Sequence, residues 1–120
     1  MLTEKRHAGD FILSEGDGNF SRDNVTIVSG ASVLEAGTAL GKITASGKYG
    51  VYDNAAVDGR QAVAAVLYGS ADPTAGDTAA CVINRTAEVV ATLLVWPIGA
   101  AADITAGIAD LLAIGVIVRF

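Results

Sequence analysis

The sequence predicts a single, mainly β domain, a small barrel or sandwich, with one short C-terminal helix and an extended N-terminal arm. Turn signals recur about every 10 residues, which is typical of all-β domains rather than of alternating α/β chains. Only one apolar stripe has helical spacing, and it lies near the C-terminus. The length of 120 residues suits one domain, and a chain of this size buries about 65% of the surface that it exposes when unfolded.

The N-terminal part of the chain is its most polar part and predicts an arm. Charged residues and glycines crowd it, and only the run Phe11-Ile12-Leu13 is apolar. Terminal segments of this kind are often mobile unless something ties them down. We therefore divide the chain into an arm, residues 1–23, and a β-rich domain, residues 24–120. In an extended arm, Phe11 and Leu13 point one way and Ile12 points the other.

Apolar stretches bounded by turn residues predict the strands of the domain. These stretches are residues 24–28, 38–44, 48–52, 61–68, 78–85 and 88–96. The last two resemble a hairpin pair, whereas residues 71–77 contain turn-forming residues and predict a loop.

The helix is predicted by apolar residues at i, i+4, i+7 and i+8. They are Ile104, Ile108, Leu111 and Leu112. Asp103 favours the positive N-terminal end of this helix, and Gly115 suits the left-handed position that follows it. Residues 116–120 then return to the alternation of a strand.

The strand expected at residues 88–96 has large apolar side chains on both faces. The alternate residues of this strand that include Val89 should face the core. Leu94 and Trp96 then lie on the outer face. Two interpretations follow: a loop or the helix covers these side chains, or they form a subunit interface, where Trp is enriched. In the second interpretation the contact residues are Leu94, Trp96 and Pro97, and the high apolar content of the chain favours oligomerisation.

The composition weakens the enzyme, metalloprotein and nucleic-acid interpretations. Eight basic and 13 acidic residues give a net charge of −5, with no basic run for a nucleic acid or an anionic membrane. One Cys and one His cannot build a zinc site, and they make Ser-His-Asp or Cys-His catalysis improbable. The lysines at Gly41-Lys42 and Gly47-Lys48 fail the spacing of a phosphate loop. We therefore expect neither a cofactor nor a metal.

The chain is apolar, with 52% hydrophobic residues and a mean hydropathy of +0.47. Its longest uncharged run, Val89–Ala102, contains Pro97 and is shorter than the roughly 20 residues of a membrane-spanning helix. The N-terminus has no apolar core of a signal peptide. These features predict a soluble protein that is made in a cytoplasm.

Three blocks of sequence resemble the bacteriophage head decoration family typified by the phage lambda D protein. The first is GTALGKITASGKYGVYD (Gly37–Asp53), followed by AVAAVLYG (Ala62–Gly69). The second is the upstream GDFILSEGDGNFSRDNVTI (Gly9–Ile27), similar to the arm of long-armed members. The third is LVWPIGAAADITAGIADLLAIGVIVR (Leu94–Arg119). The resemblance covers residues 9–119 with domain-sized spacings kept.

This resemblance implies a small β-barrel or β-tulip-like domain that assembles as a homotrimer. It implies that the trimer sits on the outer surface of an icosahedral virion head, at threefold and quasi-threefold positions, after manufacture in the cytoplasm of a host bacterium. There it cements subunits of the major capsid protein once the shell has expanded. No catalysis and no cofactor are implied. The alternatives are a virion-surface module that binds glycans or the host surface, which needs an exposed aromatic platform, and a small β-barrel enzyme.

The arm is the candidate for capsid binding, because an extended segment can add as a strand to an exposed sheet edge. The candidate residues are Gly9, Asp10, Phe11, Ile12, Leu13 and Ser14. One arm binds weakly, but three arms on one trimer bind together and raise the avidity by about 10²–10⁴-fold.

Overall fold

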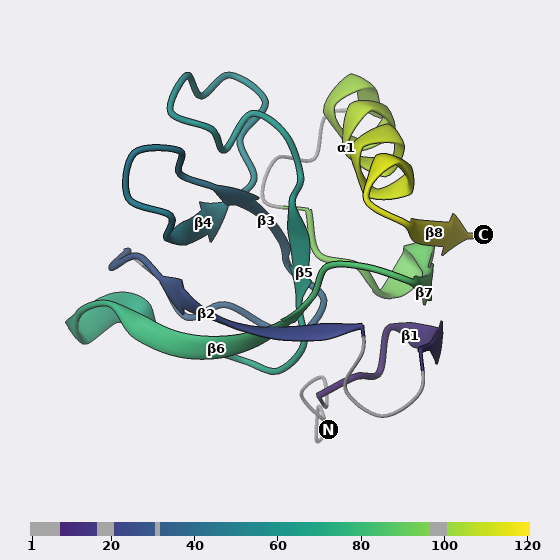
Figure 1. The fold of residues 1–120 in the computed structure, drawn as a ribbon, viewed down its shortest axis with the longest axis horizontal. Coiled ribbons are helices and arrows are strands. Elements are labelled where there is room, and N and C mark those ends of the chain that lie inside the picture. Colours follow the sequence, from purple (N-terminus) through teal and green to yellow (C-terminus); the bar gives the residue numbers. More distant parts are fainter. Residues whose placement is uncertain (1–7, 17–20, 31, 97–100) are drawn as a thin grey trace, which may run out of the picture.

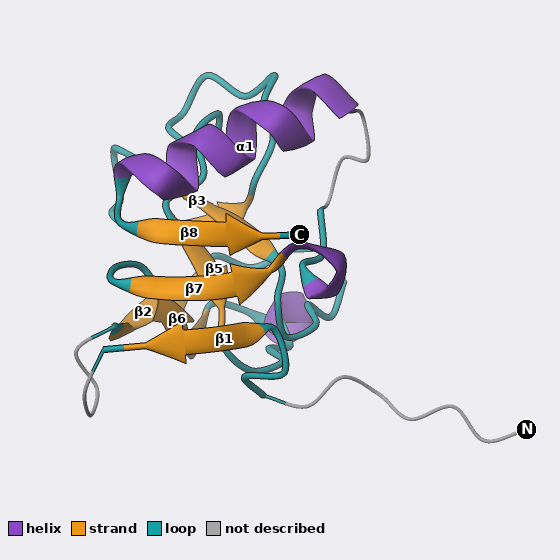
Figure 2. Ribbon diagram, turned by 90° about the vertical axis from the view of Figure 1, so that its right-hand side faces the viewer, coloured by secondary structure: helices purple, strands orange, loops and turns teal. Residues whose placement is uncertain are grey.

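The computed structural model describes residues 8–16, 21–30, 32–96 and 101–120. Over these residues the chain is mainly β, with a closed five-stranded barrel, a separate three-stranded sheet and one α-helix (Figure 1). The predicted fold class is therefore confirmed. The sheet packs against the barrel, and the helix lies beside the sheet (Figure 2).

The barrel consists of five short antiparallel and parallel strands in the order β2-β4-β3-β5-β6. Their bounds are β2 Arg22–Ile27, β3 Ala39–Lys42, β4 Tyr49–Val51, β5 Ala65–Leu67 and β6 Thr78–Ile83. β2 and β6 pair along their whole length, in antiparallel register. Closure between β2 and β4 instead depends on one parallel pair, Ile27 with Tyr49. The barrel is consequently closed at one end of β2 and open at the other.

The second sheet has the order β1-β7-β8 and lies beside the helix (Figure 2). Its strands are β1 Ile12–Glu15, β7 Ala87–Val90 and β8 Val116–Arg119. β1 runs antiparallel to β7, whereas β8 runs parallel to β7. The helix α1, Ala101–Ala113, ends just before β8 and runs alongside that strand, as a crossover between parallel strands requires.

Two short 3-10 helices complete the described elements. η1, Pro73–Ala75, lies in the predicted loop at residues 71–77, where the Asp72 carboxylate caps its first turn. η2, Ala91–Leu93, follows β7 directly. The strand expected over residues 88–96 therefore ends at Val90, and the alternation assumed beyond that point does not exist.

The predicted hairpin between residues 78–85 and 88–96 is wrong. β6 pairs with β2 and β5, whereas β7 pairs with β1 and β8. The chain leaves the barrel at the turn before β7, where Thr86 takes a left-handed backbone conformation (φ 43°). This turn directs β7 into the second sheet, where it pairs with β1 and β8.

Buried side chains form two clusters. One fills the barrel and contains Ile27, Leu40, Leu67 and Val82. The other lies between the barrel, the three-stranded sheet and the helix, and contains Phe11, Tyr52, Val89, Leu111 and Val116. The second cluster joins segments from both ends of the chain into one domain.

A pair of glycines lets a loop lie on the outside of the barrel. Gly41 of β3 and Gly50 of β4 face each other in register. Arg60, in the loop between β4 and β5, covers both: a Cβ on Gly41 would lie 2.5 Å from the Arg60 Cα, and one on Gly50 would lie 2.9 Å from the Arg60 Cδ. The absence of side chains at these two positions therefore determines how closely the loop approaches.

We expect Gly41→Ala to lower the free energy of unfolding by about 1–3 kcal/mol, because the methyl group meets backbone atoms that cannot rotate away. Gly30→Ala is the matched control, since its Cβ would have no described neighbour nearer than the Val28 carbonyl oxygen, at 4.0 Å. It should change stability by less than about 0.5 kcal/mol. Urea unfolding measures both variants, and equal stabilities would contradict the close approach.

Candidate capsid-binding and subunit-contact residues

The described part of the predicted arm is tied to the domain. β1 pairs with β7, and three backbone bonds extend this contact beyond the strand. The Gly9 N–H donates to the Tyr68 carbonyl (2.9 Å), the Gly16 N–H to the Thr86 carbonyl (3.1 Å), and the Val90 N–H to the Phe11 carbonyl (2.8 Å). These bonds anchor residues 9–16 to the second sheet and to Tyr68, which follows β5 of the barrel. Residues 1–7 of the predicted arm lie outside the described residues.

Phe11 and Leu13 point to different environments, contrary to the expected alternation. Phe11 is 1% exposed and belongs to the shared core, whereas Leu13 is 56% exposed and Ile12 is half-buried. The register between β1 and β7 shifts between Ile12 and Ser14. Such an irregularity changes which side of the strand the next side chain faces. It places Phe11 inside the domain and leaves Leu13 available to a partner.

Side chains on the three strands of the second sheet meet at Glu88. Ser14 Oγ donates to Glu88 Oε2 (2.7 Å), and Arg119 Nε and Nη2 lie 2.8 and 2.7 Å from Glu88 Oε1. Hydrogen bonds to the ionised carboxylate lower the pKa of Glu88 below its ordinary value. The bond from the Ser14 hydroxyl has the largest effect, and the bond from the Arg119 guanidinium has the next largest. Glu88 thus connects β1 to β7 and β8 through charge-assisted hydrogen bonds.

A second ion pair holds the end of β1 to the start of β2. Arg22 Nη2 and Nε lie 2.6 and 3.1 Å from the two carboxylate oxygens of Glu15. The same guanidinium lies over the Tyr68 ring, 4.2 Å from its centroid. Bidentate pairing and stacking together restrict Arg22, which a lone surface ion pair does not do.

β1 is an edge strand, because the described sheet has β7 on one side of it and no strand on the other. Its outer backbone edge and the exposed side chain of Leu13 lie together. Of the other predicted arm residues, Asp10 and Ser14 are exposed and Gly9 is half-buried. The structure therefore brings a strand edge and one apolar side chain to the surface, which is the combination that strand addition uses.

Leu94 and Trp96, the subunit-contact candidates, pack within the chain. Leu94 is 6% exposed and belongs to the shared core. Trp96 is half-buried and meets Tyr52 edge-to-face at 6.1 Å. A Cβ on Gly107 of α1 would lie 2.5 Å from the Trp96 ring, so the helix covers that ring. The interpretation that the helix covers Trp96 is confirmed, and Pro97 lies outside the described residues.

The tyrosines that a glycan-binding platform would use are mostly buried. Tyr49 and Tyr52 are 7% and 0% exposed. Tyr68 lies beneath the Arg22 guanidinium, and Trp96 beneath the helix. These rings do not form an exposed aromatic surface, so the geometry gives no support to the glycan-binding alternative.

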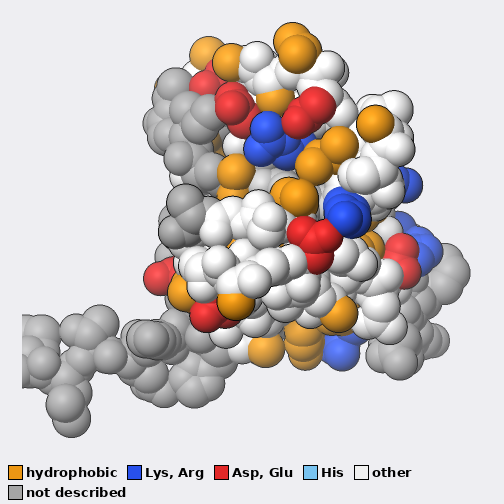
Figure 3. All heavy atoms as spheres, turned by 90° about the vertical axis from the view of Figure 1, so that its left-hand side faces the viewer, with side chains coloured by type: hydrophobic (Ala, Val, Ile, Leu, Met, Phe, Trp, Pro, Cys, Tyr) orange, Lys and Arg blue, Asp and Glu red, His pale blue; other side chains and the backbone are white. Residues whose placement is uncertain are grey.

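The described residues contain no group of three His, Cys, Asp or Glu side chains arranged to hold a metal ion. Burial raises the pKa of the Cys81 thiol, which lowers its nucleophilicity at neutral pH. Cationic and acidic side chains lie together on the face shown in Figure 3. Ion pairs among the described residues include Arg60 with Asp58 (3.1 Å) and Lys48 with Asp77 (2.5 Å). In the part of the chain that is described, no helix is long and apolar enough to cross a membrane.

We expect Phe11→Ala to lower the free energy of unfolding by about 3–5 kcal/mol, because it empties a site in the shared core. Leu13→Ala, two residues away and exposed, should change stability by less than about 0.5 kcal/mol. Denaturant unfolding of both variants tests whether β1 is docked. If the arm were free, neither substitution would change the free energy of unfolding.

The lowered pKa of Glu88 predicts a pH dependence of stability. The folded chain holds this proton less tightly than the unfolded chain does. The ionised Glu88 carboxylate therefore stabilises the folded chain fully when the pH is above the pKa that Glu88 has in the unfolded chain. This stabilisation is lost as the pH falls through the pKa that Glu88 has in the folded chain. Glu88→Gln should remove the loss of stability that protonation of Glu88 causes as the pH falls below the ordinary range of a glutamate carboxyl. Thermal unfolding of both proteins across that range measures it, and parallel pH curves would contradict the assignment.

The geometry describes a small β domain with an anchored N-terminal strand whose outer edge is exposed. The family model for bacteriophage lambda head decoration protein D matches residues 1–116. No curated protein matches the chain. The family match extends over the barrel, the second sheet and the helix, up to the first residue of β8. The chain therefore belongs to the bacteriophage lambda head decoration protein D family, the structural proteins that decorate a phage head.

Proposed function

We propose that the chain forms a homotrimer that binds the outer surface of the expanded head at threefold and quasi-threefold positions. The trimer stabilises the shell against the pressure of packaged DNA, and its partner is the major capsid protein. Its role is structural, without catalysis or a cofactor. The family match over residues 1–116 is the observation that carries this proposal.

The capsid contact is the N-terminal segment that contains Gly9–Ser14. The exposed edge of β1 and the Leu13 side chain support this assignment. Each backbone bond to a capsid strand contributes about 0.5–1.5 kcal/mol net. Ordering a free segment costs about 1–2 kcal/mol per residue, and β1 avoids much of this cost because β7 already orders it.

Three such contacts on one trimer act together. Linked binding sites raise avidity by about 10²–10⁴-fold when all of them can engage at once. The spacing of capsid subunits that suits three contacts exists only after the shell expands. Binding thus depends on maturation without any conformational switch in the decoration protein.

The contact between subunits involves Trp96 and Pro97, two of the three candidate residues. Leu94 is enclosed in the core, whereas Trp96 keeps part of its surface outside the helix. A half-covered Trp suits the edge of an interface, where aromatic residues are enriched.

Leu13→Asp should weaken binding to expanded heads by more than about tenfold, because the defect repeats at each of three contacts. Val57→Asp is the matched control, since Val57 is an apolar loop residue that is 95% exposed. It should bind as the wild type does. Co-sedimentation with undecorated expanded heads, with unexpanded heads as the control, gives the affinities.

Sedimentation equilibrium of the same proteins checks the assembly. The expected mass is three times the 12.1 kDa of one chain. Wild-type protein that binds neither type of head would overturn the decoration proposal. A monomeric mass would remove the avidity argument, and full binding by Leu13→Asp would remove β1 from the contact.

A further inference from the structure

The loop between β4 and β5 contains one of the two Asp-Gly pairs in the sequence, Asp58-Gly59. The other pair, Asp17-Gly18, lies outside the described residues. An Asp-Gly pair is chemically reactive, because the peptide nitrogen of the glycine can attack the carboxyl carbon of the aspartate before it. Glycine has no side chain that hinders this approach, and its backbone rotates freely enough to allow it.

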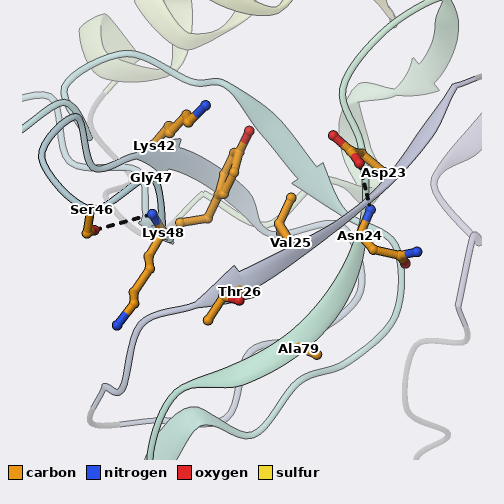
Figure 4. Close-up of a pocket in the computed structure, with 10 residues that line it drawn as sticks. Asp23, Asn24, Val25, Thr26, Lys42, Ser46, Gly47, Lys48 and Ala79 are labelled. Atoms are coloured by element: carbon orange, nitrogen blue, oxygen red, sulfur yellow. Dashed lines mark hydrogen bonds between the residues drawn. The ribbon is translucent and has the colours of Figure 1, made fainter.

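Packing requires the glycine of this pair. Gly59 has a positive φ of 117° and lies against the β3–β4 hairpin. A Cβ at this position would lie 2.2 Å from the Lys42 carbonyl oxygen and 2.6 Å from Thr44 Oγ1. Figure 4 shows Lys42 together with Ser46 and Gly47 from the loop of this hairpin. Any larger residue at position 59 would therefore displace the hairpin.

Asp58 is held through its backbone and through its side chain. Its carbonyl oxygen accepts the Thr44 N–H (2.9 Å). Its carboxylate accepts the Arg60 N–H (3.2 Å) and pairs with Arg60 Nε (3.1 Å). Arg60 is the residue that covers the facing glycines of β3 and β4. Asp58 and Gly59 thus attach the loop to the barrel, and the fold keeps a reactive pair for structural reasons.

The reaction open to this pair converts the aspartate into isoaspartate. The Gly59 nitrogen bonds to Asp58 Cγ, and the hydroxyl of the neutral carboxyl group leaves as water with the proton of that nitrogen. Water then opens the resulting succinimide ring at the carbonyl that belonged to the original peptide bond. The product has an unchanged mass, but its main chain runs through Cβ and Cγ and is one carbon longer.

Two contacts in the folded loop oppose this reaction. The Gly59 N–H donates to Oε1 of the exposed Gln61 side chain (2.8 Å), and this bond must break before the nitrogen can attack. Hydrogen bonds from Arg60, chiefly the one from its backbone N–H, lower the pKa of the Asp58 carboxyl. The neutral acid that reacts is therefore rarer at neutral pH than in an unperturbed aspartate.

We propose that Asp58-Gly59 is a site of isoaspartate formation, and that Gln61 slows the reaction in the folded protein by holding the Gly59 N–H. The site goes beyond the proposed function, since it belongs to the domain whether or not a head is bound. The longer main chain of the product cannot keep the Thr44 bond and the Arg60 contacts together. Isomerisation therefore loosens the loop from the barrel.

Gln61→Met tests the role of Gln61, because it keeps the length of the side chain and removes the acceptor oxygen. In folded protein at neutral pH, isoaspartate at position 58 should form about 2–10-fold faster than in the wild type, the rate equivalent of one net hydrogen bond. Mass spectrometry with electron-transfer fragmentation distinguishes the two isomers. Asp17-Gly18 is the matched control within the same chain, and the substitution should leave its rate unchanged.

The same measurement in concentrated urea separates the contact from the sequence. Both proteins should react at equal rates at position 58 there, because the unfolded chain does not hold the Gly59 N–H against Gln61. Urea unfolding should give both proteins the same stability, so that global unfolding does not explain a faster reaction. Equal rates at position 58 in the two folded proteins would overturn the role of Gln61. Absence of isoaspartate at position 58 in urea, while it forms at position 17, would overturn the site itself.

Discussion

The position of β1 on the surface of this protein depends on the burial of Phe11. This side chain lies in the core between the barrel, the second sheet and the helix. It fixes β1 against β7, so that the outer edge of β1 and the Leu13 side chain are held in place. A strand that is ordered before binding loses less conformational entropy on meeting a partner than a free tail does. The same burial joins the N-terminal segment to the stability of the whole domain.

The strands of the barrel and those of the second sheet are joined in different ways. The sheet carries its polar links on the surface, where Glu88 connects all three strands. The barrel is closed on one side by a single pair between β2 and β4, whereas β2 pairs with β6 along its whole length. Edge strands are usually blocked in proteins that act alone. In the proposed function, the edge of β1 instead meets the shell.

Local sequence patterns predicted the positions of most elements. Each predicted strand stretch overlaps an observed strand, although β2 and β7 begin before their predicted stretches, and the stripe ending at Leu112 lies in α1 as expected. The patterns failed where pairing depended on distant segments. The expected hairpin of β6 and β7 did not form, and the register shift in β1 reversed the direction of Leu13 relative to Phe11. Neither feature has a local signal, because both depend on which strand lies opposite.

The sequence by itself determined the fold class, the C-terminal helix and the family, because periodicity, turn residues and ordered blocks of residues are all local properties of the chain. Only the tertiary structure decided that Trp96 lies under α1, that Leu94 is enclosed, and that the described part of the arm is anchored. Burial and strand edges are created when segments far apart in sequence meet. The pair that closes the barrel is of the same kind, since it joins Ile27 of β2 to Tyr49 of β4.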